Sequence, residues 1–350
     1  MTPDERHIKR INRYLRKING LFDDLVRDIA LLVVKQRLTG KIFRFRDYQK
    51  ITTQVSNALN TYHDNLFSSI QTYTKYEWDY GNAKVSEILA ENLAKIKGKV
   101  SGLAYDVKLK EISTHSQNKK ALEAFQERKK GKFTVSDRVW NITKQAKENL
   151  EIAIDDALSE GMSAQDLARK IKHNLNDPDK LFRRVRDKHG NLVLSKNAQS
   201  FHPGQGVYRS AHKNALRLAA NEINTAYREA EQLRIMSNND VVGQKINLSP
   251  QHKVYDMCDE LQGSYPKDFN WSSWHVGCKC FRTMILKSQS ELITEINNSQ
   301  NLSPEASANF VSGVPDNFHS WLSENRETLE KRKSKPYFLE ENKEKLKHLL

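Results

Sequence analysis

The stretch His252-Lys-Val-Tyr-Asp-Met-Cys-Asp-Glu-Leu-Gln-Gly263, followed by Trp274-His-Val-Gly-Cys-Lys-Cys280, contains all three cysteines of the chain. A disulfide framework would need more cysteines, and in pairs. Zinc favours four tetrahedral ligands drawn from thiolate and imidazole groups. We therefore predict a structural zinc site that protein ligands fill completely, with no open position for water. The expected ligands are Cys258, His275, Cys278 and Cys280, with His252 and Asp256 as alternates.

Two other interpretations of the cysteines stay open. Cys258 could form a disulfide with Cys278 or Cys280 and leave one thiol free, although a reducing compartment opposes this. The three residues could also be reduced cysteines packed in a core, with a histidine beside them. The spacing differs from that of a standard zinc finger, because a single residue separates Cys278 from Cys280 where two or more are usual.

The same side chains also allow a catalytic interpretation. Cys258 with His252 or His275 could act as nucleophile and base, and His252, Asp256 and His275 could hold the metal ion of a nuclease. No P-loop, nucleophile elbow or paired Glu motif accompanies them in the sequence. We therefore expect a protein that is not an enzyme, with a metal-dependent nuclease or toxin as the alternative.

The N-terminal part of the chain is helical in pattern. Thr2, Pro3 and Glu5 form a helix start signal with a capping box. Apolar residues then alternate at spacings of three and four, which is a heptad seam; they are Ile8, Ile11, Leu15, Ile18, Phe22, Leu25, Ile29 and Leu32. The helical pattern continues over 47–99, where we expect the aromatic residues to fill a core; they are Tyr73, Tyr76, Trp78 and Tyr80. We predict a helical bundle over 1–100, packed within the chain or serving oligomerisation.

Two less regular regions follow. Residues 101–133 are weakly periodic and end in the basic run Arg128-Lys-Lys-Gly-Lys132, so we expect a connector or arm. A helix is predicted from Thr134, and a stop at Gly161 followed by a cap at Ser163 predicts an αα-hairpin. The polar insertion over 176–207 has the pattern of a short β-hairpin that ends in Leu192-Val-Leu194.

The C-terminal part alternates helix and strand. The pattern predicts a helix over 209–233, a strand over 241–246, and a separate small helical unit over 288–350. The fold class that we predict is mainly α, with a small α+β domain over 134–287 that the cysteine and histidine residues pin. The short helical tail then follows that domain.

Composition favours an anionic neighbour. Lys and Arg exceed Asp and Glu by 57 to 43, which gives a formal net charge of +14. Such an excess suits packaged DNA, although a solvated basic surface would produce it too. The start of the chain is charged and lacks the pattern of a secretory signal, so we expect assembly in a cytoplasm, without membrane contact.

Three sequence elements together resemble a known family. They are the helix Arg217-Leu-Ala-Ala-Asn-Glu-Ile-Asn-Thr-Ala-Tyr-Arg-Glu-Ala-Glu231, the segment Asp256-Met-Cys-Asp-Glu-Leu-Gln-Gly263, and the box His275-Val-Gly-Cys-Lys-Cys280. Their order resembles the C-terminal domain of Mu F-like phage head morphogenesis proteins. That domain usually carries an Arg-x-x-x-x-Glu helix, which Arg217 and Glu222 match, and a His-Pro-Asn-Cys-Arg-Cys box, from which Val276, Gly277 and Lys279 depart.

The resemblance covers about residues 134–287 and implies a minor capsid protein of a tailed phage or prophage. Such a protein would act inside the virion near the portal vertex, in head assembly or genome delivery. Its expected partners are portal and capsid proteins and packaged DNA, bound without sequence selectivity. The candidate DNA contacts are basic residues of the polar insertion, namely Arg183, Arg184, Arg186 and Lys188.

Overall fold

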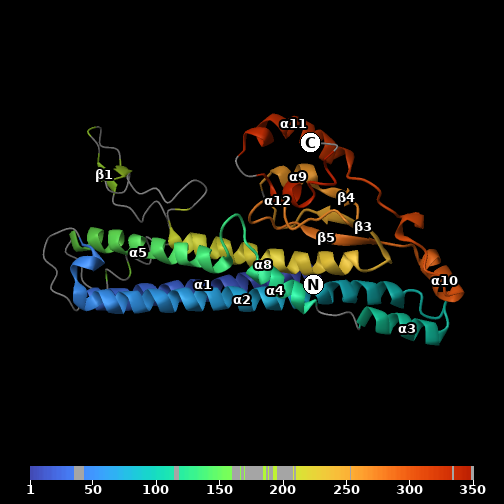
Figure 1. Cartoon of the computed structure of the whole chain (residues 1–350), viewed down its shortest axis with the longest axis horizontal. Coiled ribbons are helices and arrows are strands. Elements are labelled where there is room, and N and C mark those ends of the chain that lie inside the picture. Colours follow the sequence, from blue (N-terminus) through green and yellow to red (C-terminus); the bar gives the residue numbers. More distant parts are fainter. Residues whose placement is uncertain are drawn as a thin grey trace. The chain divides into compact units, whose positions relative to one another are not determined.

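The computed structural model describes residues 1–34, 43–113, 118–159, 210–252, 254–332 and 335–347, together with 166, 169, 184–186, 188, 192–194 and 208. The fold is mainly helical with a small antiparallel sheet, as the sequence predicts (Figure 1). The helices are α1 (Pro3–Val34), α2 (Gln49–Ala94), α3 (Gly102–Ser113), α4 (Lys119–Glu127), α5 (Val135–Ser159), α8 (Ala211–Met236), α9 (Met257–Leu261), α10 (Gln289–Asn298), α11 (Asp316–Lys331) and α12 (Tyr337–Glu341), with 3-10 turns η1 (Phe45–Asp47) and η2 (Pro304–Ala306). The strands are β1 (Arg184–Arg186), β2 (Leu192–Leu194), β3 (Val241–Asn247), β4 (Gly263–Tyr265) and β5 (Phe281–Leu286). Within the described ranges, none of the helices combines the length and the apolar character of a membrane span.

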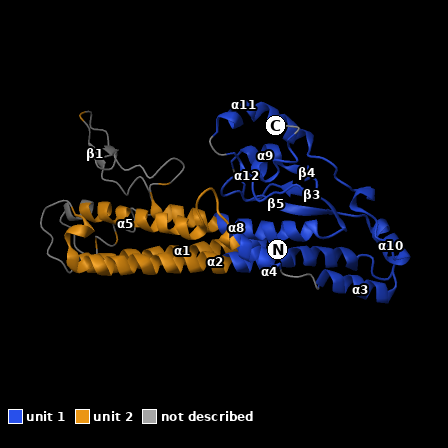
Figure 2. Cartoon of the chain, viewed as in Figure 1, with its two compact units in different colours: residues 1–9, 74–125, 221–350 blue, residues 10–73, 126–220 orange. Residues whose placement is uncertain are grey.

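Two compact units divide the chain, and each combines stretches that are distant in the sequence (Figure 2). The unit that contains 1–9, 74–125 and 221–350 is called the sheet unit below, and the unit that contains 10–73 and 126–220 is called the helical unit. The expected boundaries at 100, 133 and 287 run in sequence order, whereas these units do not. Long helices explain the difference, because α1, α2 and α8 each give residues to both units.

Apolar side chains at helical spacing fill the helical unit. The buried residues of its two long helices include Ile18, Phe22, Leu25, Ile29, Val55, Leu59, Tyr62, Leu66 and Ile70. The ring of Phe22 meets that of Tyr62 edge-on, with centroids 5.6 Å apart. The heptad seam predicts that Leu15 and Leu32 are buried, but both are half-buried. Their sequence neighbours Tyr14 and Val33 are buried in their place. A straight helix repeats every 3.6 residues, so a strict heptad drifts across its face.

The aromatic residues of α2 do not share one environment. Trp78 is buried and packs near Phe125 of α4, with ring centroids 5.6 Å apart. Tyr76 and Tyr80 are 48% and 46% exposed. The expectation that these aromatic residues all fill a core was therefore wrong for the two tyrosines, because one helix cannot turn positions 76, 78 and 80 to the same side.

The region that we expected to be a connector, 101–133, contains two helices. Ile112 of α3 joins an apolar cluster with Val85, Leu89 and Leu93 of α2. Leu122 and Phe125 of α4 are buried beside Trp78. Few apolar residues are needed to hold such short helices against a longer one, and a sequence window of this length shows little periodicity.

The second half of the helical unit follows the predicted pattern. Thr134 and Asp137 begin α5 through mutual backbone and side-chain hydrogen bonds of 2.9 and 3.2 Å. The backbone pairs β1 with β2 antiparallel, as expected for a hairpin. The start of the predicted second helix of the αα-hairpin, Gly161 and Ser163, lies outside the described residues.

The sheet of the sheet unit has the strand order β4-β3-β5, with antiparallel pairing throughout. Its core continues into the tail: Phe318 and Trp321 of α11 and Phe338 of α12 belong to the same apolar cluster as Trp271 and Trp274. The expectation of a separate unit over 288–350 was therefore wrong. Large aromatic side chains of the tail complete a core that the sheet alone leaves open.

Candidate metal centre

A capped short helix positions Cys258. The side chain of Asp256 accepts a hydrogen bond from the backbone N–H of Cys258 at 2.7 Å, and the backbone N–H of Asp256 donates to Asp259 Oδ2 at 2.8 Å. These contacts form a capping box at the start of α9. Cys258 therefore lies in the first turn of α9, directly after the residues that cap it.

A tight turn positions Cys278 and Cys280. The backbone N–H of Cys278 donates to the carbonyl of His275 at 3.1 Å. Gly277 lies within this turn at a φ of +82°, a conformation that glycine adopts without strain. Cys280 directly precedes β5, so the sheet anchors one end of the turn.

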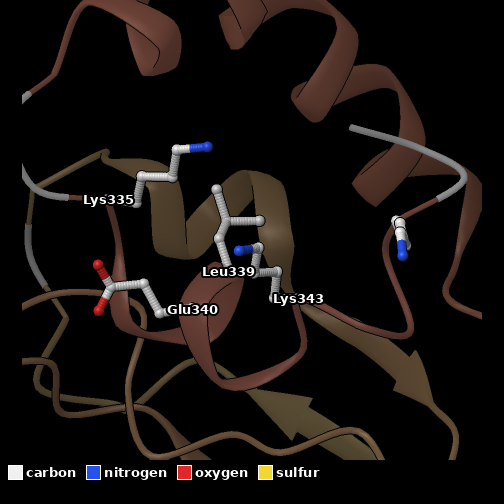
Figure 3. Close-up of a pocket in the computed structure, with 5 residues that line it drawn as sticks. Lys335, Leu339, Glu340 and Lys343 are labelled. Atoms are coloured by element: carbon white, nitrogen blue, oxygen red, sulfur yellow. The ribbon is translucent and has the colours of Figure 1, made fainter.

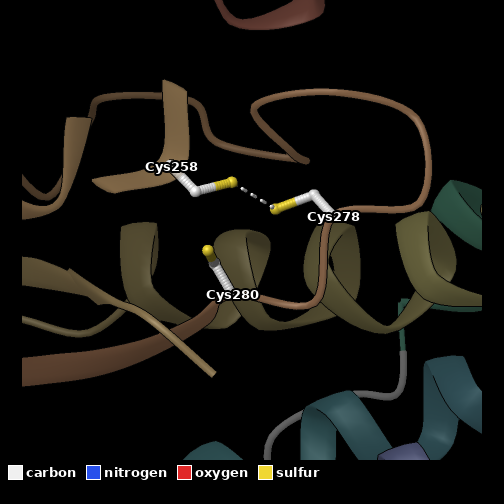
Figure 4. A group of neighbouring side chains, drawn as sticks. All are labelled: Cys258, Cys278 and Cys280. Carbon is white, nitrogen blue, oxygen red and sulfur yellow. Dashed lines mark hydrogen bonds between the residues drawn. The ribbon is translucent and has the colours of Figure 1, made fainter. Parts of the chain in front are cut away.

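The three sulfur atoms converge. Cys258, Cys278 and Cys280 are at most 3% exposed, and their sulfur atoms lie within 4.8 Å of one another (Figure 4). The Sγ atoms of Cys258 and Cys278 are 3.8 Å apart. Two sulfurs that each lie about 2.3 Å from a tetrahedral zinc ion are about 3.8 Å apart. All three cysteines are free thiols in this structure, and the cluster could hold a metal ion.

His275 meets this group through Cys258. Its Nε2 lies 3.1 Å from Cys258 Sγ and 3.2 Å from Asp256 Oδ2, and its Nδ1 lies 3.0 Å from the carbonyl oxygen of Val276. The Val276 carbonyl and the Asp256 carboxylate both only accept, so these contacts favour a proton on either ring nitrogen. As a metal ligand, His275 would keep its proton on Nδ1, toward the carbonyl, and present the lone pair of Nε2 to the ion beside Cys258.

The two alternate ligands, His252 and Asp256, take part in other hydrogen bonds. His252 Nε2 lies 2.7 Å from Asp259 Oδ2, whose hydrogen bond raises the pKa of His252. Asp256 Oδ1 is 3.9 Å from the same nitrogen, and Asp256 also caps α9. Donor atoms of His252, Asp256 and Cys258 do lie within 4.8 Å of one another, so they could also share a cation. Asp256 is already engaged in the capping box, and His252 contacts its second member, Asp259.

Mutual hydrogen bonds separate the pKa values of the thiols. Hydrogen bonds from Cys258 and Cys280, helped by the charge of Arg228, lower the pKa of Cys278 well below its usual value. Donation to Cys278 raises the pKa of Cys258. For Cys280, the contact with Cys258 favours the thiolate, but the contact with Cys278 and burial prevail and raise the pKa to about 12. Hydrogen bonds from two neighbouring thiols and the charge of Arg228 therefore favour the thiolate form of Cys278.

One face of α8 carries polar side chains that the sequence patterns did not single out. Asn224 Nδ2 donates to the carbonyl of Cys278 at 3.1 Å, and Gln232 Nε2 donates to that of Lys267 at 2.9 Å. Between them, Arg228 donates to the carbonyls of Ser272, Cys278 and Cys280 at 2.7, 3.0 and 2.6 Å. The three residues are spaced by four, so they share one helix face. Their spacing by four was a signal in the sequence, but α8 contains many other polar residues that hide it.

Arg217 and Glu222, the residues that match the family helix, lie on α8 as expected. Glu222 is fully buried in the sheet unit. Arg217 belongs to the helical unit, where its guanidinium carbon lies 5.3 Å from the ring centroid of Tyr208. The role of these two residues stays a prediction.

A hollow of about 530 Å³ borders the cluster on its solvent side. Its lining residues are Gln251, His252, Val254, Asp256, His275, Gly277 and Lys279. The hollow therefore reaches the cluster through His275 and Asp256, whereas the cysteines do not line it. The three cysteines are buried, so the centre is enclosed on the protein side. The imidazole of His275 is partly exposed, so solvent can reach the centre at this residue.

The candidate DNA contacts of the insertion are only partly described. Arg183 lies outside the described residues, Arg184 and Arg186 are described as backbone of β1, and Lys188 is exposed. A second hollow, of about 310 Å³, lies beside α12 (Figure 3). It is lined by three lysines, one apolar residue and one carboxylate, namely Lys335, Lys343, Lys347, Leu339 and Glu340.

Comparisons with models of protein families, with curated proteins and with solved structures found no match to this chain.

Proposed function

We propose that Cys258, His275, Cys278 and Cys280 bind one zinc ion and that the ion is structural. The burial of the three sulfur atoms, each at most 3% exposed, carries this proposal. A catalytic zinc ion needs an open position toward substrate, whereas sulfur ligands that face one another leave the ion enclosed. Soft thiolate ligands favour zinc over calcium or magnesium, which prefer oxygen.

The ion would join two elements that hydrogen bonds alone hold weakly. Cys258 belongs to a helix of five residues, and Cys280 directly precedes β5. A helix this short is unstable by itself in water. A metal ion bound to both elements would therefore hold α9 against the sheet, as structural zinc sites do in small domains.

We propose further that the chain is a structural minor capsid protein of a tailed phage, acting near the portal in head assembly or genome delivery. The order of the α8 helix, the strand and the cysteine box supports this. Gly277 stands where the family box has asparagine, the residue that best tolerates a positive φ after glycine. The net charge of +14 supports contact with DNA that is not sequence-selective.

Two measurements test the proposal. Purified protein should contain about one equivalent of zinc, and the variant Cys278→Ser/Cys280→Ser should contain none; wild-type protein free of metal would refute the zinc site. Co-expressed with the head and portal proteins of the phage or prophage that this proposal assigns it to, the chain should purify with the portal. Copies found only outside assembled heads would contradict the capsid role, whatever the zinc content.

The hollow beside the cluster supports one alternative, a metal-dependent nuclease or toxin. His252, Asp256, His275 and Lys279 line this hollow and are of the types that bind a catalytic metal ion and a phosphate. Cleavage of DNA or RNA that requires a divalent metal and disappears in His252→Ala would favour the enzyme. His319→Ala serves as the matched control, because His319 is also a histidine, is exposed and does not line the hollow.

A further inference from the structure

We propose that Arg228 is the positioning residue of the metal centre, which rests on the zinc site proposed above. It fixes the backbone that carries two ligands, and its charge balances that of the loaded centre. Its side chain is 4% exposed and lies on α8, outside the ligand sequence.

The contacts of Arg228 converge on the turn that carries Cys278 and Cys280, which is called the ligand turn below. One guanidinium nitrogen donates to the carbonyls of both Cys278 and Cys280, and the other donates to the carbonyl of Ser272. The guanidinium carbon also lies 4.4 Å from the ring centroid of Trp271, so an aromatic face holds the plane of the fork. Arginine is the side chain that can donate several bonds in one rigid plane, and lysine cannot reproduce that geometry.

A hydrogen-bond chain that begins at His7 and Glu77 supports the same carbonyl through Asn224. Asn224 Nδ2 donates to the Cys278 carbonyl, and Asn224 Oδ1 lies 2.9 Å from His7 Nε2. His7 Nδ1 in turn lies 2.6 Å from Glu77 Oε2. The Cys278 carbonyl therefore accepts from two side chains of α8, which leaves the backbone of this ligand little freedom. Groups that orient metal ligands in this way affect metal affinity strongly.

Charge gives Arg228 a second role. Three thiolates, one neutral imidazole and a divalent ion sum to one negative charge, which is costly to bury without a cation. Arg228 has no ion pair with a carboxylate in the described part of the chain. By contrast, the neighbouring buried Arg282 lies 4.0 Å from Glu231. The uncompensated cation of Arg228 and the anionic centre therefore complement each other.

The test compares Arg228→Lys with Arg234→Lys. Arg234 lies on the same helix, is 3% exposed and donates to the carbonyl of Ile112 at 3.2 Å, far from the ligand turn. Zinc affinity is measured by competition with a chromophoric chelator, and Co²⁺ replaces zinc to report ligand geometry by absorption. We expect Arg228→Lys to weaken zinc binding by about tenfold to a hundredfold and to alter the Co²⁺ spectrum. Arg234→Lys should stay within about threefold of wild type, because its contacts include no ligand.

Several results would overturn the proposal or the zinc site on which it rests. Equal losses of affinity in the two variants, or no loss in Arg228→Lys, would overturn the proposal. An Arg228→Lys chain that fails to fold in excess zinc while Arg234→Lys folds would also overturn it, because Arg228 would then be required for the fold as a whole and not for the geometry of the centre. If the wild-type chain binds neither zinc nor Co²⁺, the zinc site itself is refuted, whatever the zinc affinities of the two variants.

Discussion

The long helices of the helical unit and the ligand turn of the sheet unit are stabilised in different ways. Along α1 and α2 the buried side chains are apolar and recur at helical spacing, as with Ile18, Phe22 and Leu66. Around the ligand turn, buried polar groups such as Arg228 and Gln244 satisfy backbone carbonyls of residues 266–280. Apolar packing is tolerant of its partners, whereas a polar contact requires one acceptor at one place. The two regions should therefore respond differently to truncation, metal and pH.

The largest effect is expected from Phe22→Ala. Phe22 is 2% exposed and packs edge-on against Tyr62, so its removal leaves a cavity. We expect the free energy of unfolding to fall by about 3–5 kcal/mol, measured by urea denaturation. The loss should be the same with zinc or with chelator. A loss that depends on zinc would mean that the two regions do not differ as described.

Removal of the metal ion should give the next largest loss of stability. The loss should arise at the ligand turn and not along the long helices. With free zinc at about a thousand times its dissociation constant, binding adds about 4 kcal/mol to the free energy of unfolding. Denaturation followed by circular dichroism, with zinc and then with excess chelator, measures this difference. Cys278→Ser serves as the control, because zinc should no longer change its stability. An equal zinc effect in that variant would place the ion elsewhere.

Gly277→Ala should cost less. The Cβ atom of alanine would meet no heavy atom within 4 Å, so any loss comes from the positive φ of +82° and not from crowding. A left-handed conformation costs a residue with a Cβ atom about 1–2 kcal/mol. Thermal unfolding of Gly277→Ala and Gly277→Asn separates the effects, because asparagine tolerates this conformation better. Equal melting temperatures for wild type and Gly277→Ala would show that the turn can relax.

The smallest effect concerns Glu291 in the tail. Its carboxylate accepts hydrogen bonds from the backbone of Ala308 and Ser288, which lower its pKa to about 2. A lowered pKa in the folded state stabilises the protein above the unfolded pKa of about 4.5, and the contribution is lost as the pH falls toward 2. Glu291→Ala should cost about 1 kcal/mol at neutral pH, as loss of a capping box does. The difference from wild type should shrink in acid; a constant difference would exclude the carboxylate as its cause.

Local patterns predicted several elements because local contacts form them. The capping box of Thr2 and Glu5 forms with hydrogen bonds of 2.8 and 3.2 Å, and the buried face of α1 follows its apolar spacing. The strand over 241–246 and the cysteine cluster also appear where expected. Predictions failed where the outcome depended on distant residues: α3 and α4 pack on α2, and Phe318 and Phe338 complete the core of the sheet unit.

The sequence by itself determined which ligand types are available and that they lie within two short stretches, since thiols and imidazoles are visible as residues. Only the tertiary structure decided that the three sulfurs meet, that His275 and Asp256 join them to a hollow, and that Arg228 holds the turn. The reason is that periodicity records which side of a helix is apolar. It carries no information on which distant carbonyl a buried guanidinium will reach, because that acceptor is identical in every residue.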